Sequence, residues 1–385
     1  MEHLRGLPRP SPDRAMYQAT LEAGFQAFPR RRDNYLRYQA ARRGERADYL
    51  PIRLDIENVS RCNYHCTMCQ VSDWPGFKRA GDMSLGDFTS LLDGQEGLIE
   101  IKLQGMGEPL LGGCYVEMVA HARARHLWVR STTNGSLLHL REHYKRVIDA
   151  DICEFQVSID GATKPTYEAI RRGGRFERVL ENCRLLNRYC RDAGRRRTRM
   201  WAVVQRDNFD ELERFPTLAA DLGFERLTFS LDLNDWGQDR WRSVNDQVDM
   251  HRRFDLELAR RLIDLGARQG VEVTYWFIDE KYDVDDPRHL CQWPFERAYV
   301  SSDMRVVPCC MIANPEIVDL GDARDLAAAW NGARMAAFRR LHLSGRIPQV
   351  CQSCYKTRPP ASAILTGEAA AGIVTEDGQA PAAAQ

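Results

Sequence analysis

The feature that most restricts the fold of this chain is a repeated alternation of strand and helix patterns between about residues 52 and 231. Ser84 is the expected N-cap of one helix, and Gly194 the expected end of another. Repeated units of this kind predict an α/β domain with a parallel sheet, either doubly wound or curled into a barrel. In a barrel of this kind the chemistry lies at the C-terminal ends of the strands. The expected strands are IRLDIENV, GLIEIKLQG, LWVRSTTN, CEFQVSID, RMWAVVQ and RLTFSLD.

Three cysteines follow the first expected strand, in the segment SRCNYHCTMCQ at residues 60–70. They are Cys62, Cys66 and Cys69. A structural zinc ion and an iron–sulfur cubane both usually take four protein ligands, so three thiolates on one short loop predict a [4Fe–4S] cluster with one open iron. The alternative is a zinc site completed by His65 or by a distant cysteine, which would make the chain a zinc-stapled binding protein.

Composition excludes several other classes of protein. The formal net charge is +0, which gives no overall attraction to nucleic acid or to an anionic membrane. No stretch approaches the roughly 20 apolar residues of a membrane span, and the first residues lack the apolar core of an export signal. We therefore expect a cytoplasmic protein whose 12 cysteines serve as metal ligands or core residues and not as disulfides.

The C-x3-C-x2-C spacing after a first strand resembles the signature of the radical S-adenosylmethionine (SAM) superfamily. This resemblance implies a partial (βα)6 TIM-like barrel that binds SAM at the open iron of the cluster. It also implies reductive cleavage of SAM to a 5′-deoxyadenosyl radical, which abstracts hydrogen from a substrate. A flavodoxin- or ferredoxin-type electron donor would supply the electron.

Motifs at later strand ends match the same family in order. The segment QGMGEP at 104–109 resembles the family's GGE motif, in which Gly105 and Gly107 would let the backbone approach the methionyl group of SAM. Polar residues at the next strand ends would bind ribose hydroxyls or the SAM carboxylate, and Met68 and Gln205 would lie toward adenine. The implied SAM-binding residues are Met68, Gly105, Gly107, Glu108, Asn134, Ser158, Asp160 and Gln205.

A second group of cysteines, in CQWPF, VVPCC and CQSC, resembles the auxiliary-cluster extension called SPASM or, in its shorter form, Twitch. The cysteine count suits one additional four-thiolate cluster, which gives two [4Fe–4S] clusters in all. Zinc bound by the same cysteines is the alternative. The implied ligands are Cys291, Cys309, Cys351 and Cys354, with Cys310 as an alternative to Cys309.

These patterns divide the chain into four expected regions. An Arg-rich extension at 1–50 precedes a radical SAM core at 51–280, and a small iron–sulfur module follows at 281–357. The strand pattern VEVTYWFI is expected to lead out of the core. Residues 358–385 are rich in Ala, Gly and Pro and are expected to be a disordered tail.

Family members with a single auxiliary cluster include dehydrogenases of sugars and aminocyclitols in natural-product biosynthesis, so we expect oxidation of an alcohol on such a small molecule. The alternatives are an epimerase or dehydratase of a similar substrate, or a peptide-modifying enzyme. Asp232, Asp235 and Trp236, after the sixth strand, are substrate-side candidates, although a solvated loop with an anchoring tryptophan fits equally well. Cys310 or Cys114 could donate hydrogen in an epimerase, but the sequence identifies neither this donor nor a general base.

Overall fold

The computed structural model describes residues 4–277 and 281–356. Within this part of the chain, ten strands form one sheet in the order β10-β9-β8-β1-β2-β3-β4-β5-β6-β7. Strands β1 to β7 and β8 are joined by parallel pairs, and β9 and β10 are antiparallel. The strands are β1 Arg53–Ile56, β2 Glu100–Leu103, β3 Trp128–Thr133, β4 Glu154–Ser158, β5 Thr198–Val203, β6 Arg226–Ser230, β7 Glu272–Trp276, β8 Arg297–Val300, β9 Arg305–Val307 and β10 Gly321–Asp322.

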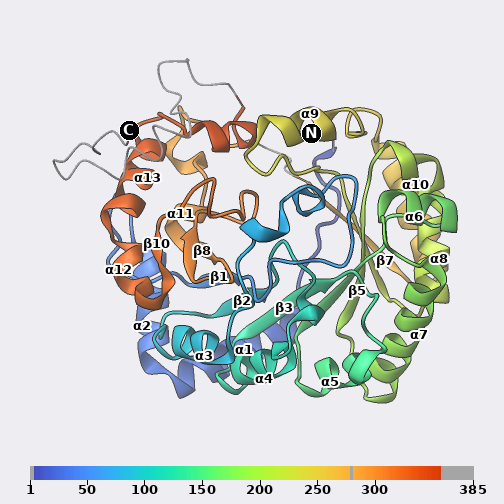
Figure 1. Cartoon of the computed structure of the whole chain (residues 1–385), viewed down its shortest axis with the longest axis horizontal. Coiled ribbons are helices and arrows are strands. Elements are labelled where there is room, and N and C mark those ends of the chain that lie inside the picture. Colours follow the sequence, from blue (N-terminus) through green and yellow to red (C-terminus); the bar gives the residue numbers. More distant parts are fainter. Residues whose placement is uncertain (1–3, 278–280, 357–385) are drawn as a thin grey trace.

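The helices surround a curved sheet, and the architecture is a partial TIM barrel of the α/β class (Figure 1). Within the described residues, no helix is both long and apolar enough to cross a lipid bilayer. The α-helices are α1 Arg14–Ala27, α2 Pro29–Ala40, α3 Leu85–Asp93, α4 Tyr115–Ala124, α5 His143–Asp149, α6 Lys164–Ile170, α7 Phe176–Asp192, α8 Phe215–Asp221, α9 Asp239–Asp246, α10 Leu256–Arg268, α11 Trp293–Glu296, α12 Leu326–Trp330 and α13 Ala333–Leu343.

The six strands expected from the sequence are confirmed as β1 to β6. Ser84 caps α3, because its side chain accepts a hydrogen bond from the Asp87 backbone NH. Gly194 follows α7 with a φ of +64°, a conformation that suits glycine. The expected tail at 358–385 lies outside the described residues.

The expectation that VEVTYWFI leads out of the core was wrong. Within this segment, Glu272–Trp276 forms β7, which pairs in parallel with β6 and extends the sheet. Its alternate residues Val273 and Tyr275 are buried in the core, and the Tyr275 hydroxyl donates to the Ala259 carbonyl of α10 at 2.8 Å. The packing of α10 therefore keeps β7 on the barrel.

The N-terminal residues cover the amino ends of the strands. The Tyr17 ring packs edge-on against Trp128 at the start of β3, with ring centroids 5.1 Å apart. The Ser11 carbonyl accepts from Arg199, and the Pro8 carbonyl accepts from the Tyr275 backbone NH. The Arg-rich extension thus packs against the end of the barrel opposite to the expected site.

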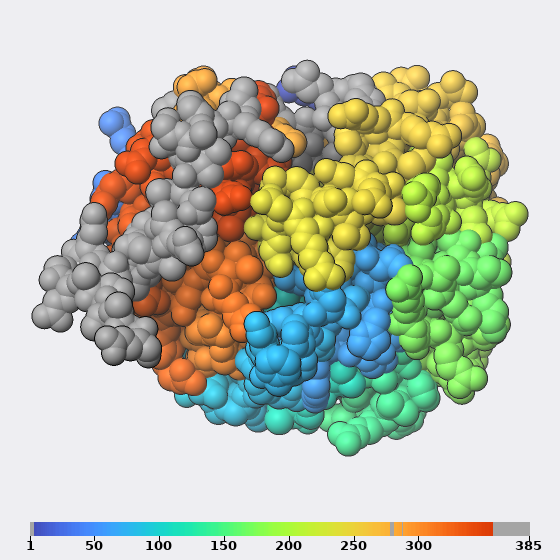
Figure 2. Space-filling model, turned by 45° about the horizontal axis from the view of Figure 1, so that its top comes forward, coloured from blue at the N-terminus to red at the C-terminus, as the bar shows by residue number. Residues whose placement is uncertain are grey.

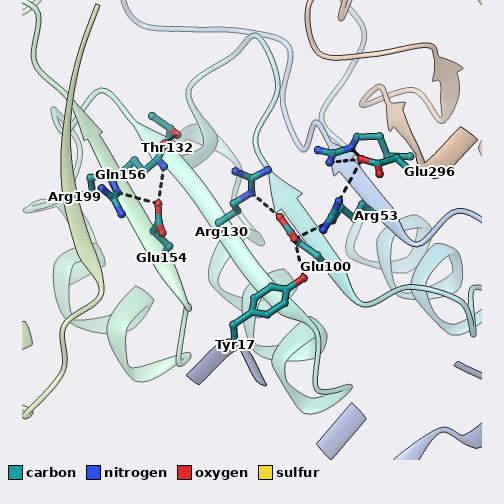
Figure 3. Close-up of polar contacts among 10 residues, drawn as sticks. Tyr17, Arg53, Glu100, Arg130, Thr132, Glu154, Gln156, Arg199 and Glu296 are labelled. Atoms are coloured by element: carbon teal, nitrogen blue, oxygen red, sulfur yellow. Dashed lines mark hydrogen bonds and ion pairs between the residues drawn. The ribbon is translucent and has the colours of Figure 1, made fainter. Parts of the chain in front are cut away.

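Charged side chains cross the inner face of the sheet in ion pairs (Figure 3). Glu100 lies 3.2 Å from Arg53 Nε and 2.9 Å from Arg130 Nε, so one carboxylate links three strands. Further along the sheet, Arg199 Nε lies 3.3 Å from Glu154 Oε1. The outer face carries the apolar alternate residues, so the interior of this barrel is polar while its shell is apolar.

Candidate active site

The three-cysteine loop is held against the C-terminal end of α6 and the residues just after it. The His65 backbone NH donates to the Arg172 carbonyl at 2.8 Å, and the Thr67 NH donates to the Ile170 carbonyl at 3.0 Å. Within the loop, the Cys69 NH donates to the Cys66 carbonyl at 3.1 Å. The fold therefore fixes the loop backbone from outside as well as from within.

The thiols of this loop are close enough to act on one another. Burial raises the pKa of Cys62 to about 12, and Glu108, Cys69 and Cys66 add to the shift. Burial likewise raises the pKa of Cys69 to about 12, with a further contribution from Cys66. All three cysteines are free and half-buried.

Three thiols on one loop are a donor set of the kind that iron–sulfur clusters take. In the described part of the chain, no three His, Cys, Asp or Glu side chains converge as they would on a single metal ion. The thiolates of a cubane each bind a different iron, so they need not meet at a point. Thiols with raised pKa values must lose their protons when they bind metal, so loading is expected to release protons.

The glycines of the QGMGEP turn are needed for packing. A Cβ atom on Gly105 would lie 2.3 Å from the Glu57 side chain, and one on Gly107 would lie 2.3 Å from the Val59 carbonyl. The expected role, a close approach to SAM, is therefore not the only reason for glycine here. Glu57 accepts from the Met106 NH at 2.8 Å, and this bond helps to hold the turn.

Glu108 binds the end of β3. It is 2 % exposed, and its two carboxylate oxygens accept from the Thr133 hydroxyl at 2.6 Å and the Asn134 backbone NH at 2.7 Å. Asn134 in turn donates to the Asn63 side chain at 2.9 Å, inside the cysteine loop. The structure thus brings Glu108, Asn134 and Cys62 together, with Glu108 positioning its neighbours.

Asp160 is held in a buried ion pair that the sequence did not reveal. Its Oδ1 accepts from the Val203 NH at 2.8 Å, and its Oδ2 lies 2.7 Å from Arg171 Nη2. Burial would lower the pKa of Arg171, but the Asp160 and Cys66 groups raise it. Arg171 lies near the cysteine loop, yet nothing in the local pattern IRRGG distinguishes it from an exposed arginine.

The remaining predicted SAM-side residues lie at the same end of the barrel. Ser158, the last residue of β4, is half-buried, and Gln205, after β5, is fully buried. Within the described residues, the side-chain NH2 of Gln205 has no hydrogen-bond partner. The Met68 carbonyl accepts from Trp236 Nε1 and from Asn245 Nδ2, both at 3.3 Å.

Trp236 therefore contacts the cysteine loop, where the sequence favoured a substrate surface or a core anchor. Its backbone φ is +55°, and the neighbouring Gln238 side chain donates to the Gln70 side chain at 2.9 Å. Asp235 is held by Arg242 at 3.2 Å and by the Gly237 NH at 3.0 Å. We call residues 232–246 the α9 bridge; Figure 2 shows its yellow surface against the light-blue segment around residues 60–80. Asp232 belongs to the same bridge.

The second group of cysteines gathers beside the bridge. Burial raises the pKa of Cys309 well above its usual value, and four cysteines, at 291, 310, 351 and 354, add to the shift. Burial also raises the pKa of Cys351 well above its usual value, and Cys291, Cys354 and Asp235 add to this shift. The four predicted ligands are therefore close together and half-buried.

Cys310 faces a different environment from Cys309. Burial raises the pKa of Cys310 to about 11. Asp55 raises this pKa further, whereas Lys102, Arg297 and Arg130 lower it, and all four residues lie on strands of the barrel. Its thiol thus lies toward the inner face of the sheet. This difference favours Cys309 as the ligand and leaves Cys310 next to the barrel interior.

Two residues that sequence reasoning missed support the second group. The Tyr355 hydroxyl accepts from the Cys291 NH at 3.3 Å and lies 2.7 Å from His342 Nδ1. Burial lowers the pKa of His342 to about 3, so this histidine is neutral. Tyr355 follows the last cysteine directly, but its contact with Cys291 depends on the fold.

Comparisons with known proteins agree with this geometry. The radical SAM superfamily model matches residues 58–219, and the iron–sulfur cluster-binding domain SPASM matches residues 291–355. A mycofactocin maturase, MftC of Mycobacterium tuberculosis, is 30% identical over 228 residues, which cover 58% of this chain and 55% of MftC. The chain thus spans about half the length of that relative.

Two further matches cover more of the chain. The PqqA peptide cyclase of Granulibacter bethesdensis is 24% identical over 312 residues, which are 79% of each protein. The crystal structure of Streptococcus suis SuiB bound to precursor peptide SuiA has a TM-score of 0.56 at 14% identity and covers 75% of this chain and 66% of SuiB, so it supports the fold.

A radical SAM domain implies a [4Fe–4S] cluster and SAM, and a SPASM domain implies further iron–sulfur clusters. Both domains coincide with the two groups of cysteines. The chain belongs to the radical SAM superfamily and carries a SPASM iron–sulfur cluster-binding domain.

Proposed function

We propose that this chain is a radical SAM enzyme that modifies a peptide. The observation that carries the proposal is the match to the PqqA peptide cyclase, which extends over 79% of both proteins. The mycofactocin maturase supports the same class of activity over a shorter span.

In this proposal Cys62, Cys66 and Cys69 hold the cluster that binds SAM. Asn134 lies next to Cys62, with its Nδ2 3.9 Å from the Cys62 Sγ, and Arg171 is buried close to Cys66. These polar groups would orient the bound SAM, while Glu108 and Asp160 hold them in position. When bound, the cluster and SAM supply reductive SAM cleavage and hydrogen abstraction, with an electron from a flavodoxin- or ferredoxin-type donor.

Cys291, Cys309, Cys351 and Cys354 would hold one auxiliary cluster. The hydrogen bond from the Cys291 NH to Tyr355, which also contacts His342, would help to hold the Cys291 backbone at this cluster. Four thiolates leave no open iron, so this cluster would exchange electrons and would not bind the substrate directly. The peptide would enter the inner face of the barrel, between the two groups of cysteines.

Oxidation of a sugar or aminocyclitol alcohol, the activity expected from the cysteine count, lacks comparable support. The relatives match the peptide-modifying alternative better than this main expectation. Epimerisation and dehydration of a small molecule likewise have no observation in their favour. The proposed substrate is therefore a peptide, and the type of bond formed or broken is left to experiment.

The test uses anaerobically reconstituted protein, SAM, a reductant and the short peptides encoded beside its gene. Mass spectrometry should detect a peptide whose mass changes only when SAM and reductant are both present. Release of 5′-deoxyadenosine should rise when this peptide is added. If no neighbouring peptide changes, while an added sugar or aminocyclitol loses two hydrogens, the proposal is wrong.

A further inference from the structure

The inner face of the barrel carries an arginine whose guanidinium is only half used. Arg130 Nε lies 2.9 Å from Glu100 Oε1. In the described part of the chain, no ion pair or hydrogen bond involves its two terminal NH2 groups, and Figure 3 shows them pointing away from Glu100. Arginine binds carboxylates through such paired NH groups, so Arg130 retains capacity for a second anion.

The position of Arg130 shows which way its accessible surface faces. It lies on β3, between β2 and β4, and the outward neighbour Val129 is fully buried. The Arg130 side chain nevertheless keeps 32% of its surface accessible. Because the outer face is covered, this surface opens toward the inside of the barrel.

Lys102 adds a second cation to the same face. It is the register partner of Arg130 on β2, so the two side chains lie side by side on the inner face. Lys102 is half-buried and, among the described residues, forms no ion pair. Like charges directly opposite each other on neighbouring strands are destabilising. Glu100 and Asp55 already flank this pair, and an anion in contact with both Lys102 and Arg130 would further offset their repulsion.

The surrounding side chains limit where such an anion can lie. Asp55 is the register partner of Lys102 on β1, so its charge disfavours an anion on that side. Burial lowers the pKa of Arg130, but Glu100, Asp55 and Glu154 raise it, so these carboxylates lie near its guanidinium and an anion must lie away from them. Glu100 is already shared between Arg53 and Arg130. The Arg130 side of Lys102 is therefore the favourable position.

Two tryptophans lie on the inner face of the barrel at other strands. Trp201 on β5 and Trp276 on β7 are half-buried, and their rings lie 6.3 Å apart. They share the inner face with Arg199 and Thr274, two residues earlier on the same strands. A carbon skeleton could lie against these rings while its charged group reaches the cations.

We propose that Lys102 and Arg130 form a carboxylate-binding site that receives the acidic group of the peptide residue to be modified. The carboxylate is either an Asp or Glu side chain or the C-terminus of the peptide. The choice of a peptide rests on the proposed function, whereas the anion site rests on the geometry of this chain alone. Recognition of a carboxylate by both cations would select one residue of a longer peptide.

The test is equilibrium dialysis of the anaerobic holoprotein, saturated with SAM, against small probes. N-acetyl-L-alanine presents a terminal carboxylate, and N-acetyl-L-glutamic acid methylamide presents only a side-chain carboxylate. N-acetyl-L-alanine amide is the neutral control. At least one carboxylate probe should bind ten times more tightly than the amide, and the tighter of the two identifies the source of the carboxylate.

The matched variants separate the site from general charge effects. Lys102→Gln should weaken binding of the carboxylate probe at least tenfold and leave binding of the amide unchanged. Lys102→Arg, which keeps the positive charge, should bind the carboxylate probe as the wild type does. Lys78→Gln changes an exposed lysine and should have no effect. Equal binding of carboxylate and amide probes, or unchanged binding in a folded Lys102→Gln protein with full iron content, overturns the proposal. Because no turnover is measured, these results do not depend on whether a peptide is modified.

Discussion

Cys62, Cys66 and Cys69 come from one loop, whereas Cys291, Cys309, Cys351 and Cys354 come from three separate segments around α11, β9 and α13. The first group is aligned by local backbone bonds and by the C-terminal end of α6 and the residues just after it. The second group exists only when those distant segments have packed. A local group of ligands can be identified from spacing, while a group assembled by the fold depends on long-range contacts.

The α9 bridge joins the two groups. Trp236 contacts the cysteine loop at Met68, and Asp235 lies close enough to Cys351 to raise the pKa of that thiol. A direct contact also exists, because the Gln70 side chain donates to the Ile312 carbonyl at 3.2 Å. The two groups are therefore mechanically coupled although their ligands are separate.

The largest expected effect is loss of the first group. Replacing Cys62, Cys66 and Cys69 with Ala should remove one cluster and reduce 5′-deoxyadenosine formation to background. Iron analysis and chromatography of the products measure both effects. The control is Cys114→Ala, a half-buried cysteine outside both groups, which should keep both clusters. Zinc without iron in the reconstituted wild-type protein would instead restore the zinc-binding alternative.

Loss of the second group should be more selective. In the Cys351→Ala, Cys354→Ala double variant, one cluster and SAM cleavage should persist while substrate conversion stops. The reason is that the first loop does not take ligands from this group. Simultaneous loss of both clusters would show that the two groups fold as one unit and that the comparison above is too simple.

Sequence patterns predicted the strands correctly, because strand patterns depend on local spacing. The two sets of cluster ligands, which rest on cysteine spacing and family order, stay predictions. Sequence patterns did not predict that β7 stays in the sheet, since its packing against α10 is a tertiary contact. They also missed Arg171, whose importance comes from a buried contact with Asp160. The sequence placed Trp236 only in the general region of the site, because Met68, whose carbonyl accepts from the Trp236 indole NH, is distant in the chain.

The buried pair of Asp160 and Arg171 should contribute strongly to stability. Asp160→Ala leaves a buried guanidinium without its partner and is expected to cost about 3–5 kcal/mol in the free energy of unfolding. Urea unfolding of the holoprotein measures this cost. The Asp160→Ala, Arg171→Met double variant should recover much of the loss. Equal loss in both variants would mean that the backbone contact with Val203 dominates.

Glu57 connects the QGMGEP turn to β8 and should make stability depend on pH. Its carboxylate accepts from the Met106 NH and from the Tyr299 hydroxyl, and burial raises its pKa from 4.5 to about 7. Between these values the folded state binds more protons than the unfolded chain, so the free energy of unfolding should fall as pH rises.

The pKa shift of Glu57 corresponds to about 3 kcal/mol in the free energy of unfolding. This stabilisation is lost as the pH rises from about 4.5 to about 7. Urea unfolding at pH 5 and pH 8 should therefore show a larger decrease for the wild type than for Glu57→Gln, which cannot titrate. Other groups titrate in both proteins, so the difference isolates Glu57. Parallel decreases in the two proteins would exclude this carboxylate as the cause.

The smallest expected effect concerns the bridge between the two groups. Trp236→Phe removes the hydrogen bond from the indole to the Met68 carbonyl but keeps an aromatic ring, so it should cost about 1 kcal/mol locally. Amide hydrogen exchange in residues 66–73 should become roughly fivefold faster, because local opening reports such small free energies. Trp241→Phe is the matched control, since Trp241 lies on α9 and, within the described residues, donates no hydrogen bond to the loop. If both variants leave exchange in the loop unchanged, the Asn245 contact alone holds Met68 and Trp236 does not couple the two groups.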